Sequence, residues 1–489
     1  MKRFLRNFLL CALLLAPISA FAQASSCVSL SGNLVFANKG AQVTKLQTFL
    51  KSEGYLTAAL VPNFGAATLA AVRDFQRAQG ISATGSVGPL TRAAIKKVSC
   101  AGTGASPGSS SSATSNSFEV SGWIPYWRSA TGTADVLPHL DQLTEVNPFV
   151  YSVKTNGEIV DNGGMDAEPW TSFIAAAKAK KVRVIPTVMW SNSDAMHAIL
   201  RSAPLRQALE DRIVKLVKDN DFDGIDIDFE GKHADEKEYF SLFLKGLYQR
   251  MGTKWVTCDI ESRTPLDSRY YNSEIPADAT IYANDFKEIN KYCDRVKVMA
   301  YDQQGIDLQL SEQAASSSQV YAPVADPFWV RKVIELMSKD IKKSKLMIGV
   351  PTYGYEYDVT AYANNQYVYD ILWTFNPGYA WPVASKYGIT PTRNAAGELH
   401  FSYSLDAPAF QSPTTLGGNS ALFAATAASL IANSNNSHAT FRLMDWPDAQ
   451  SIAGKAELAS DLGVRGIAIF KFDGGEDPNM WQALLGVKQ

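Results

Sequence analysis

Three acidic residues alternate with large apolar residues in the stretch DFDGIDIDFE, residues 221 to 230. On a β-strand, Asp226, Asp228 and Glu230 would share one face and Ile225, Ile227 and Phe229 the other, because successive side chains alternate. Neighbouring carboxylates would then lie roughly 6 to 7 Å apart along the strand. Like charges this close cannot all ionise cheaply, so at least one of these acids should have a raised pKa and donate a proton. The pattern indicates acid catalysis.

Two metal-binding interpretations fit these residues less well. A calcium loop also places acids at every second position, but its bidentate ligand would fall on Lys237, and Ile and Phe fill the intervening places. A zinc hydrolase requires histidine ligands, and no two of the five histidines stand at a ligand spacing. We therefore predict no metal and no cofactor.

The elements that must position these acids follow from the rest of the chain. After residue 118, stretches rich in Val, Ile and aromatic residues alternate with amphipathic helical stretches. This alternation predicts an α/β fold, a parallel (β/α)8 TIM barrel, whose active sites lie at the carboxyl ends of the strands. An open doubly wound sheet is the alternative, but no glycine-rich phosphate loop follows the first strand. The predicted strands lie in EVSGWIPYW, NPFVYSV, KVRVIPTVMW, GIDIDFE, KWVTCDIE, RVKVMAYD, KLMIGVPTYG and VRGIAIFKF.

One interval departs from this alternation of strands and helices. Residues 356 to 440, between the seventh and eighth strands, are rich in Tyr, Asn, Gly and Pro. They are predicted to form an inserted small α+β subdomain that walls one side of a cleft.

The N-terminal residues have the pattern of an export signal. Residues 1 to 22 carry Lys2, Arg3 and Arg6, then an apolar run, then Ala20-Phe21-Ala22. This order predicts a cleaved secretory signal peptide and a protein that is secreted or held in the cell envelope, periplasmic or extracellular. An uncleaved anchor helix is the alternative, for which the run is short. We expect no membrane span in the mature chain.

The net charge and the cysteines indicate which binding partners and which cellular compartment are compatible with this chain. The net charge of -2 offers no basic field for a nucleic acid, and we expect a monomer. Cys27 and Cys100 bracket one compact segment, which in an oxidising compartment suggests a disulfide. Cys258 and Cys293 lie in apolar, strand-like surroundings, where buried free thiols are the favoured interpretation and a second bridge is the alternative.

A flexible linker separates two regions. Residues 101 to 117, AGTGASPGSSSSATSNS, contain no charge and no large apolar group and should behave as a random coil. Residues 27 to 100 precede it and read as short amphipathic helices, an all-α, three-helix domain in which VTKLQTFLKSEGYL and LAAVRDFQRAQGI are two versions of one unit.

This helical segment resembles the small peptidoglycan-binding domain of bacterial wall enzymes. A helical spacer without a ligand is the alternative. The resemblance rests on Leu46-Gln47, Gly54-Tyr55, Phe64-Gly65, Thr68, Val72, Phe75-Gln76, Gly80-Ile81, Gly85 and Gly88-Pro89-Leu90-Thr91.

Residues 118 to 489 resemble a family 18 glycoside hydrolase. The family signature of acid, two residues, acid, one, acid, one, glutamate is met by Asp223, Asp226, Asp228 and Glu230. Further matches stand in family order: MAYD (299–302), GVPTYGY (349–355) and GIAIFKFDGGEDP (466–478).

The resemblance implies retaining hydrolysis in which the substrate's own N-acetyl group is the nucleophile. Glu230 would protonate the glycosidic oxygen and later activate water. Asp228 would orient the acetamide and stabilise the positively charged intermediate, and Asp226 would share a proton with Asp228. Tyr301 would hydrogen-bond the acetamide carbonyl, and Asp223 would support the strand entry.

Aromatic residues at strand ends are candidate walls for sugar rings, with core packing as the alternative for each. One departure from the family stands on the eighth strand, where Phe470 replaces the usual tryptophan and loses the indole donor. The residues expected to contact substrate are Tyr126, Trp190, Met299, Asp302, Tyr353, Tyr355 and Phe470.

Substrate assistance requires an N-acetylated sugar, so peptidoglycan and chitin both fit as β-1,4-linked polymers. The N-terminal module favours peptidoglycan, because tethering raises the local concentration of the barrel at the wall. The alternatives are a chitinase and a non-catalytic carbohydrate-binding lectin, which the presence of Asp228 and Glu230 argues against.

Overall fold

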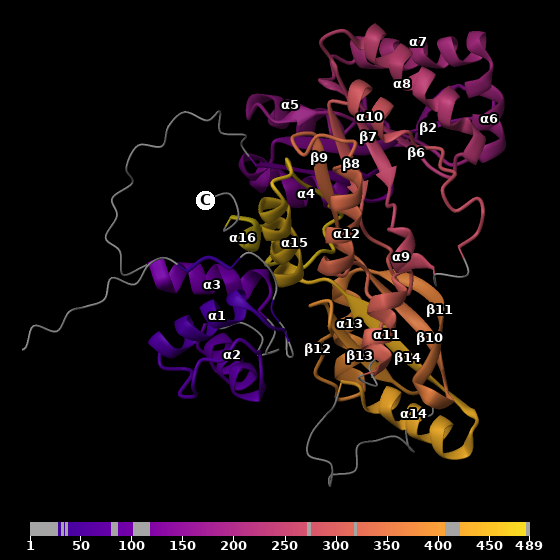
Figure 1. Ribbon diagram of the computed structural model, residues 1–489. Coiled ribbons are helices and arrows are strands. Elements are labelled where there is room, and N and C mark those ends of the chain that lie inside the picture. Colours follow the sequence, from indigo (N-terminus) through magenta and orange to yellow (C-terminus); the bar gives the residue numbers. More distant parts are fainter. Residues whose placement is uncertain are drawn as a thin grey trace, which may run out of the picture. The chain divides into compact units, whose positions relative to one another are not determined.

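The barrel strands form where the alternating pattern predicts them (Figure 1). Strand β1 pairs in parallel with both β15 and β2, and this closes the barrel. The predicted TIM barrel is therefore confirmed. Its eight strands are β1 (Glu119–Pro125), β2 (Glu145–Val153), β5 (Thr187–Trp190), β6 (Gly224–Phe229), β7 (Trp255–Glu261), β8 (Arg295–Met299), β9 (Leu346–Pro351) and β15 (Gly466–Phe470).

The third predicted strand is divided. Its first part is β4 (Arg183–Val184) and its second part is β5, and Pro186, which has no N–H to donate to a ladder, lies between them. A short strand, β3 (Ile159–Asp161), pairs antiparallel with β2 outside the barrel.

This computed structural model describes residues 28–30, 34, 38–79, 87–100, 118–270, 275–316, 320–405 and 421–485. The predicted signal peptide, the predicted linker and Cys27 lie outside the described residues, as do Gly80 and Gly85. The chain divides into two units, Met1–Ser111 and Ser112–Gln489. Within the described ranges, none of the helices combines the length and the hydropathy of a membrane span.

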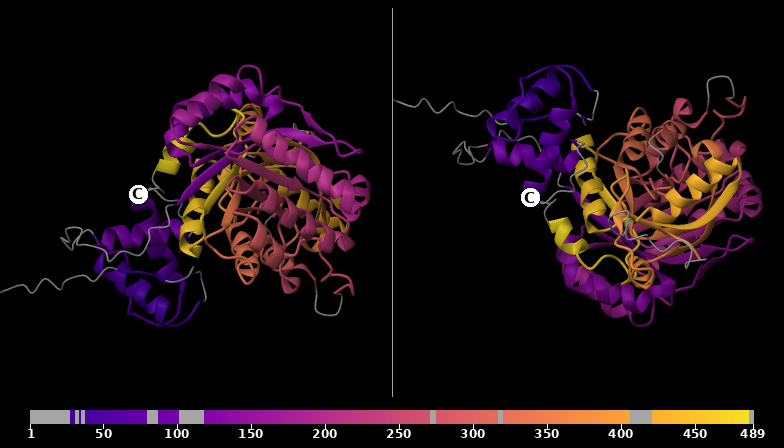
Figure 2. Two further views of the ribbon diagram at one scale, coloured as in Figure 1. Left: turned by 90° about the horizontal axis from the view of Figure 1, so that it is seen from above. Right: turned by 90° about the horizontal axis from the view of Figure 1, so that it is seen from below.

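Helices cover the outside of the barrel (Figure 2). Ile225, Ile227 and Phe229 of β6 point outward, are at most 1% exposed, and pack in the core beneath these helices. Phe229 stacks on Phe243, with ring centroids 5.2 Å apart. The predicted burial of the apolar face of β6 is confirmed. The main barrel helices are α4 (Ser129–Val136), α5 (Trp170–Ala179), α6 (Ser193–Arg201), α7 (Ala203–Asp219), α8 (Lys237–Met251), α10 (Phe286–Tyr292), α12 (Pro327–Met337), α15 (Ala449–Leu462) and α16 (Met480–Leu485).

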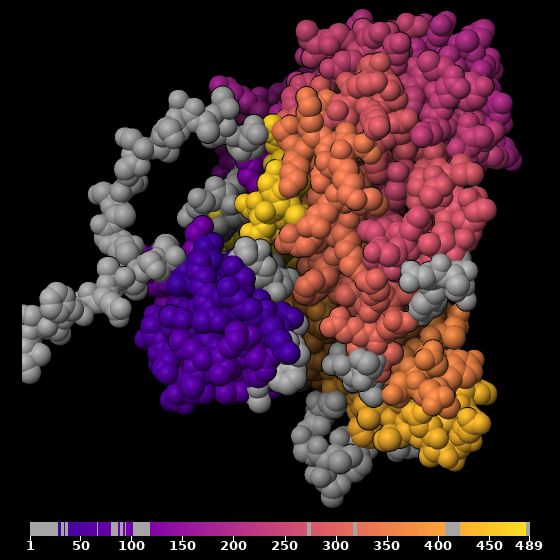
Figure 3. Space-filling model, viewed as in Figure 1, coloured from indigo at the N-terminus to yellow at the C-terminus, as the bar shows by residue number. Residues whose placement is uncertain are grey.

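The insertion between β9 and β15 is built on an antiparallel sheet of five strands, in the order β11-β10-β14-β13-β12. It spans 354 to 446, slightly more than the predicted 356 to 440, and α14 covers one face of the sheet (Figure 1). In the space-filling view, the insertion continues directly from the barrel surface (Figure 3). Its elements are β10 (Gly354–Tyr362), β11 (Gln366–Phe375), α13 (Pro377–Lys386), β12 (Thr392–Arg393), β13 (Leu399–Tyr403), α14 (Phe423–Asn435) and β14 (His438–Trp446).

The described residues of the N-terminal unit form three helices, α1 (Ala41–Ser52), α2 (Ala66–Ala78) and α3 (Pro89–Cys100), with their own apolar core. A buried glutamine in each of the first two helices donates its side-chain amide to a threonine of the next helix. Gln47 donates to Thr68 at 2.8 Å, and Gln76 donates to Thr91 at 2.9 Å. This repeated contact supports the prediction that the two stretches are versions of one unit.

Cys258 and Cys293 form a disulfide, so the favoured prediction of free thiols was wrong. Cys258 lies on the outward face of β7 and Cys293 directly follows α10, with Cα atoms 6.0 Å apart. The packing of α10 against the barrel brings the two together, which their sequence separation of 35 does not reveal. Cys100 is also disulfide-bonded, and its pairing with Cys27 stays a prediction.

Replacing both Cys258 and Cys293 by alanine should lower the free energy of unfolding by about 2 to 4 kcal/mol, because the bridge no longer restricts the unfolded chain. Urea denaturation measures this loss. Wild-type protein in reductant loses the bridge without losing sulfur atoms, and the double-alanine variant in reductant controls for the bond at Cys100, which reductant also breaks. Equal midpoints for oxidised and reduced wild-type protein would contradict the prediction.

Candidate active site

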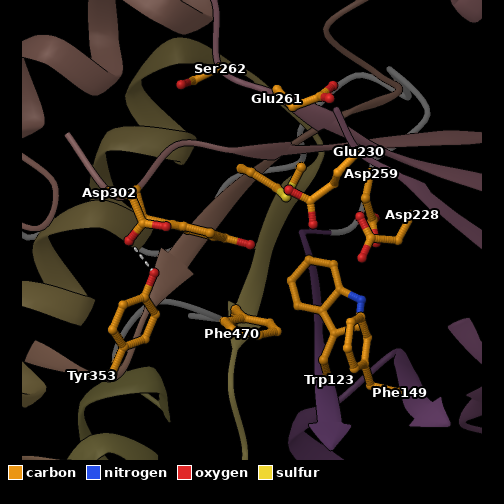
Figure 4. Close-up of a pocket in the computed structure, with 12 residues that line it drawn as sticks. Trp123, Phe149, Asp228, Glu230, Asp259, Glu261, Ser262, Asp302, Tyr353 and Phe470 are labelled. Atoms are coloured by element: carbon orange, nitrogen blue, oxygen red, sulfur yellow. Dashed lines mark hydrogen bonds between the residues drawn. The ribbon is translucent and has the colours of Figure 1, made fainter. Parts of the chain in front are cut away.

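A cavity of about 290 Å³ opens at the carboxyl ends of the barrel strands. Glu230, Asp228 and Asp259 gather on one side of it, and Asp302 and Tyr353 lie opposite, with Phe470 between the two groups (Figure 4). The cavity is lined by Trp123, Phe149, Asp228, Glu230, Asp259, Glu261, Ser262, Met299, Tyr301, Asp302, Tyr353 and Phe470.

The three alternating acids lie at decreasing depths from Asp226 to Glu230. Asp226 is completely buried beneath the cavity, Asp228 is buried at its wall, and Glu230, which follows the last residue of β6, is exposed. The β6 backbone is held in parallel register with β5 and β7, and the Glu230 N–H donates to the Trp190 carbonyl at 2.9 Å. Among the described residues, Asp228 Oδ1 has no hydrogen-bond partner.

Asp226 is surrounded by donors. Trp123 Nε1, Thr187 Oγ1 and Lys297 Nζ each lie 2.9 Å from its carboxylate, and the Thr257 hydroxyl donates to it as well. These donors come from four different strands, β1, β5, β7 and β8.

A further carboxyl group is hydrogen-bonded to Asp226. It belongs to Asp259 of β7, which is 3% exposed. Asp226 was predicted to share a proton with Asp228. Asp259, which is not part of the family signature, is a second carboxyl group with which Asp226 can share a proton.

Environment separates the pKa values of these buried acids. Burial acts to raise the pKa of Asp226, but the Lys297 ammonium and the Thr257 hydroxyl together bring it below the usual range. Burial, with the charges of Glu230 and Asp226, raises the pKa of Asp228 well above its usual value. Burial and the adjacent Asp226 likewise raise the pKa of Asp259.

Glu230 also has a raised pKa, caused by burial first and by the Glu261 carboxylate second. The Lys232 ammonium opposes this shift. Lys232 is buried, donates to the Phe229 carbonyl, and lies 3.3 Å from Glu261. Glu261 in turn accepts a hydrogen bond from Asn284 at 2.7 Å. A protonated Glu230 at the cavity wall can donate to a bound substrate.

The opposite wall is formed by tyrosines around Asp302. Both Tyr353 and Tyr355 donate to Asp302 Oδ1, the latter at 2.7 Å. Asp302 has a left-handed backbone with φ of 58°, a conformation that non-glycine residues adopt at an energetic cost and that is common at functional sites. Gly349 leaves room for Tyr301, because a Cβ there would lie 2.9 Å from the tyrosine ring and 2.4 Å from the Val298 carbonyl oxygen.

Phe470 is the centre of an aromatic floor. Its ring stacks on Tyr301 at 5.8 Å and meets the Trp123 ring edge to face at 5.8 Å. Phe149 and Tyr353 complete the ring cluster. Trp123, from β1, thus supplies an indole beside Phe470, although its N–H is used by Asp226.

The structure brings most of the predicted site residues together, namely Asp228, Glu230, Met299, Tyr301, Asp302, Tyr353 and Phe470. Trp190 is buried against Phe229, and Tyr126 packs on Trp127, so neither lines a described cavity. Tyr355 lines an adjoining cavity of about 590 Å³ with Trp127, Arg128 and Lys471.

Sequence reasoning missed several members of the site. Asp259 and Glu261 alternate with Cys258 and Ile260 as the acids of β6 alternate with isoleucines, so the same signal was available. Lys297 is a single cation within an apolar strand, RVKVM, which was also visible. Nothing in the local pattern marks Trp123 or Phe149 as lining residues.

One group of potential metal ligands lies beside the loop after β6. One ligand atom from each of His197, His233 and Asp235 falls within 4.8 Å of the others. The Arg201 guanidinium donates to Asp235 at 3.1 Å and lies 3.0 Å from His197 Nε2, so a protein cation already contacts two of the three. We assign no metal to this cluster.

A TIM barrel with buried acids at the end of one strand, facing an aromatic-floored cavity, defines a glycosidase-like site. Residues 122–475 match the glycosyl hydrolases family 18, and residues 39–95 match a peptidoglycan binding domain. The chain belongs to family 18 of the glycosyl hydrolases and carries a peptidoglycan-binding domain before the barrel.

Relatives of this chain include the uncharacterized glycosylase YvbX of Bacillus subtilis, 23% identical over 227 residues. That match covers 45% of this chain and 61% of YvbX, so the chain spans about three fifths of its relative's length.

Two solved structures share the fold. The spore cortex-lytic enzyme SleL of Bacillus cereus is similar with a TM-score of 0.53 at 17% identity, over 75% of this chain and 74% of SleL. A chitinase from Chromobacterium violaceum is similar with a TM-score of 0.54 at 19% identity, over 76% of this chain and 98% of the chitinase.

Proposed function

We propose that this protein is a secreted retaining glycosidase that hydrolyses the β-1,4 bond following N-acetylglucosamine in peptidoglycan. The observation that carries the proposal is the arrangement of Glu230 and Asp228 on one wall of the cavity, with an Asp228 oxygen that has no partner among the described residues. Family membership adds the reaction class.

The cavity supports substrate-assisted chemistry. Glu230, with its raised pKa, donates a proton to the glycosidic oxygen and then takes a proton from water. The substrate's acetamide oxygen attacks the anomeric carbon from the other face, so no second carboxylate acts as nucleophile. Asp228 accepts the acetamide N–H and stabilises the positive charge of the cyclic intermediate, while the Tyr301 hydroxyl donates to the acetamide oxygen.

The aromatic floor fits this assignment. Phe470 and its neighbouring rings offer a flat apolar surface on which the apolar face of a sugar ring can stack. The adjoining cavity beside Tyr355, Trp127 and Arg128 extends the cleft and gives room for a further sugar. Asp302, held by two tyrosines, faces Glu230 across the first cavity.

The N-terminal unit favours peptidoglycan over chitin. Residues 39–95 match a peptidoglycan-binding domain, and a module that holds the wall raises the local concentration of a tethered barrel there. We propose the predicted segments as the organisation that achieves this: a signal peptide (1–22), the binding domain (27–100), a linker (101–117) and the catalytic barrel (118–489). SleL, whose barrel is similar, is described as a spore cortex-lytic enzyme.

Parallel digestion of purified sacculi and colloidal chitin by the mature protein tests the proposal. We expect muropeptides with N-acetylglucosamine at the new reducing end, identified by mass spectrometry after reduction. Chitobiose from chitin with intact sacculi would instead make the protein a chitinase, the activity named for the similar Chromobacterium structure.

Glu230→Gln should lower kcat by about 10²- to 10⁴-fold, because the amide cannot donate the proton, while binding to the polymer is retained. Turnover on the preferred polymer and pull-down with it measure the two effects. A wild-type protein that binds without any turnover would support a lectin and contradict the assignment of Glu230.

Glu261→Gln should move the alkaline limb of the kcat/KM profile to lower pH by about half to one unit. Removing this carboxylate lowers the pKa of Glu230, so the acid loses its proton at a lower pH. Lys232→Gln is the matched variant of opposite sign, because loss of the ammonium should move the same limb to higher pH. If the alkaline limb moved in the same direction in both variants, this electrostatic explanation would be excluded.

Removal of residues 27–100 should reduce hydrolysis of sacculi by about 10²-fold through the loss of tethering. Activity on a soluble chito-oligosaccharide should not change, because each unit has its own core. Sedimentation with sacculi measures binding directly. Unchanged sacculus binding would show that residues 27–100 are a spacer.

A further inference from the structure

A chain of buried charged groups runs through the barrel beneath the active site. Lys297 of β8 is completely buried, with Nζ 2.9 Å from Asp226 Oδ1 and 3.0 Å from Glu145 Oε1. It also lies 5.1 Å from the centre of the Trp123 ring. A buried lysine between two carboxylates keeps its charge, since desolvation alone would otherwise favour the neutral amine.

Asp226 is therefore an anion. Its four hydrogen-bonding neighbours, Trp123, Thr187, Thr257 and Lys297, can all act as donors, and the indole N–H and the ammonium can act only as donors. A protonated Asp226 would direct an O–H toward one of these groups, and would leave Lys297 with one carboxylate partner in place of two.

Asp259 must then supply the proton between the two acids. A hydrogen bond between two carboxyl groups contains one proton, and with Asp226 as the acceptor that proton belongs to Asp259. Asp259 Oδ1 has no partner among the described residues, in agreement with a neutral carboxyl group whose other oxygen is the donor. The parallel register of β6 and β7 places Asp226 beside Thr257, and Asp259 follows two residues later on the same inward face of β7.

We propose that Lys297 and Asp259 are positioning residues of the reaction: Lys297 holds Asp226 as an anion, and Asp259 is a permanently protonated donor to it. Asp228 is thereby not required as the proton-sharing partner of Asp226, and its carboxyl group stays turned toward the acetamide of the substrate. The kinetic consequence depends on the proposed function, but the protonation of Asp259 does not.

Several other charged or titratable groups face this cluster and contribute to its titration. They come from the strands and loops packed around it. They are Glu145 on β2, Asp228 on β6, Glu230 and Lys232 after β6, Glu261 on β7, and Tyr301 and Asp302 after β8.

Two substitutions of Asp259 test whether its carboxyl group is a neutral hydrogen-bond donor or an ionised acid. Asp259→Asn keeps the shape and donates an amide N–H to Asp226, so kcat/KM on the polymer cleaved by wild-type protein should be largely retained. Asp259→Leu cannot donate, and the resulting shift of Asp226 and Asp228 should lower kcat by about 10²-fold with little change in KM. Loss of activity in both variants to the same extent would overturn the proposal.

The pH dependence of the melting temperature tests whether Asp259 is protonated in the folded protein, and it requires no activity assay. A carboxyl group whose pKa is raised in the folded state keeps a proton that the unfolded chain releases above about pH 4, so it lowers stability progressively as pH rises. Asp259→Asn removes this penalty, and its Tm relative to wild type should rise between about pH 5 and pH 8. A flat or falling difference would show that Asp259 is ionised in the folded protein, and would also overturn the proposal.

Asp448→Asn is the matched control, another buried acid changed to its amide, at the N-cap of α15. Burial acts to raise the pKa of Asp448, but Arg393 lowers it, so the group contributes stability that is lost only as pH falls below about 4. Its Tm difference from wild type should be constant between about pH 5 and pH 8. If the wild-type protein cleaves neither polymer, the proposed function fails while the Tm comparison still decides the state of Asp259.

Discussion

The buried ammonium of Lys297 is the interaction on which the interior of the barrel depends. TIM barrels usually fill their centre with branched apolar side chains, whereas this barrel places Glu145, Asp226 and Asp259 there. Carboxylates without water are tolerated only when a charge or a proton compensates them. Lys297 compensates two of them directly, and through Asp226 it determines where the proton on the third must lie.

A carboxylate is also compensated by cationic side chains at the opposite end of the strands. Glu119, at the start of β1, accepts a paired hydrogen bond from Arg295 at 2.6 and 2.8 Å and is within ion-pair distance of Arg183 and Arg465. The Arg183 and Arg295 guanidinium groups lie against the Trp255 ring. Because these partners come from different strands, a shift of register in any one strand would leave a buried charge unpaired. The polar interior therefore specifies the alignment of the strands that present the acids of the cavity.

Much of this arrangement was predictable because strands report their two faces in sequence. The alternation in DFDGIDIDFE gave the outward burial of Ile225 and Ile227 and the depth order of the acids, and the strand–helix alternation gave the barrel. What could not be predicted depends on neighbours in space. The bond between Cys258 and Cys293 requires the position of α10, and the role of Asp259 requires the register between β6 and β7. Trp190 was predicted to contact substrate, but a strand-end aromatic can turn either to the cavity or to the helices, and here it packs on Phe229.

A short connection joins the barrel to the first strand of the insertion. Strand β9 ends at Pro351 and β10 begins at Gly354. Of the two tyrosines that bind Asp302, Tyr353 lies in this connection and Tyr355 lies on β10. The wall of the cleft and the loop after β8 are consequently tied by side chains as well as by the backbone. The position of Asp302 in the cleft is therefore determined partly by tyrosines that lie 51 and 53 residues away in the sequence.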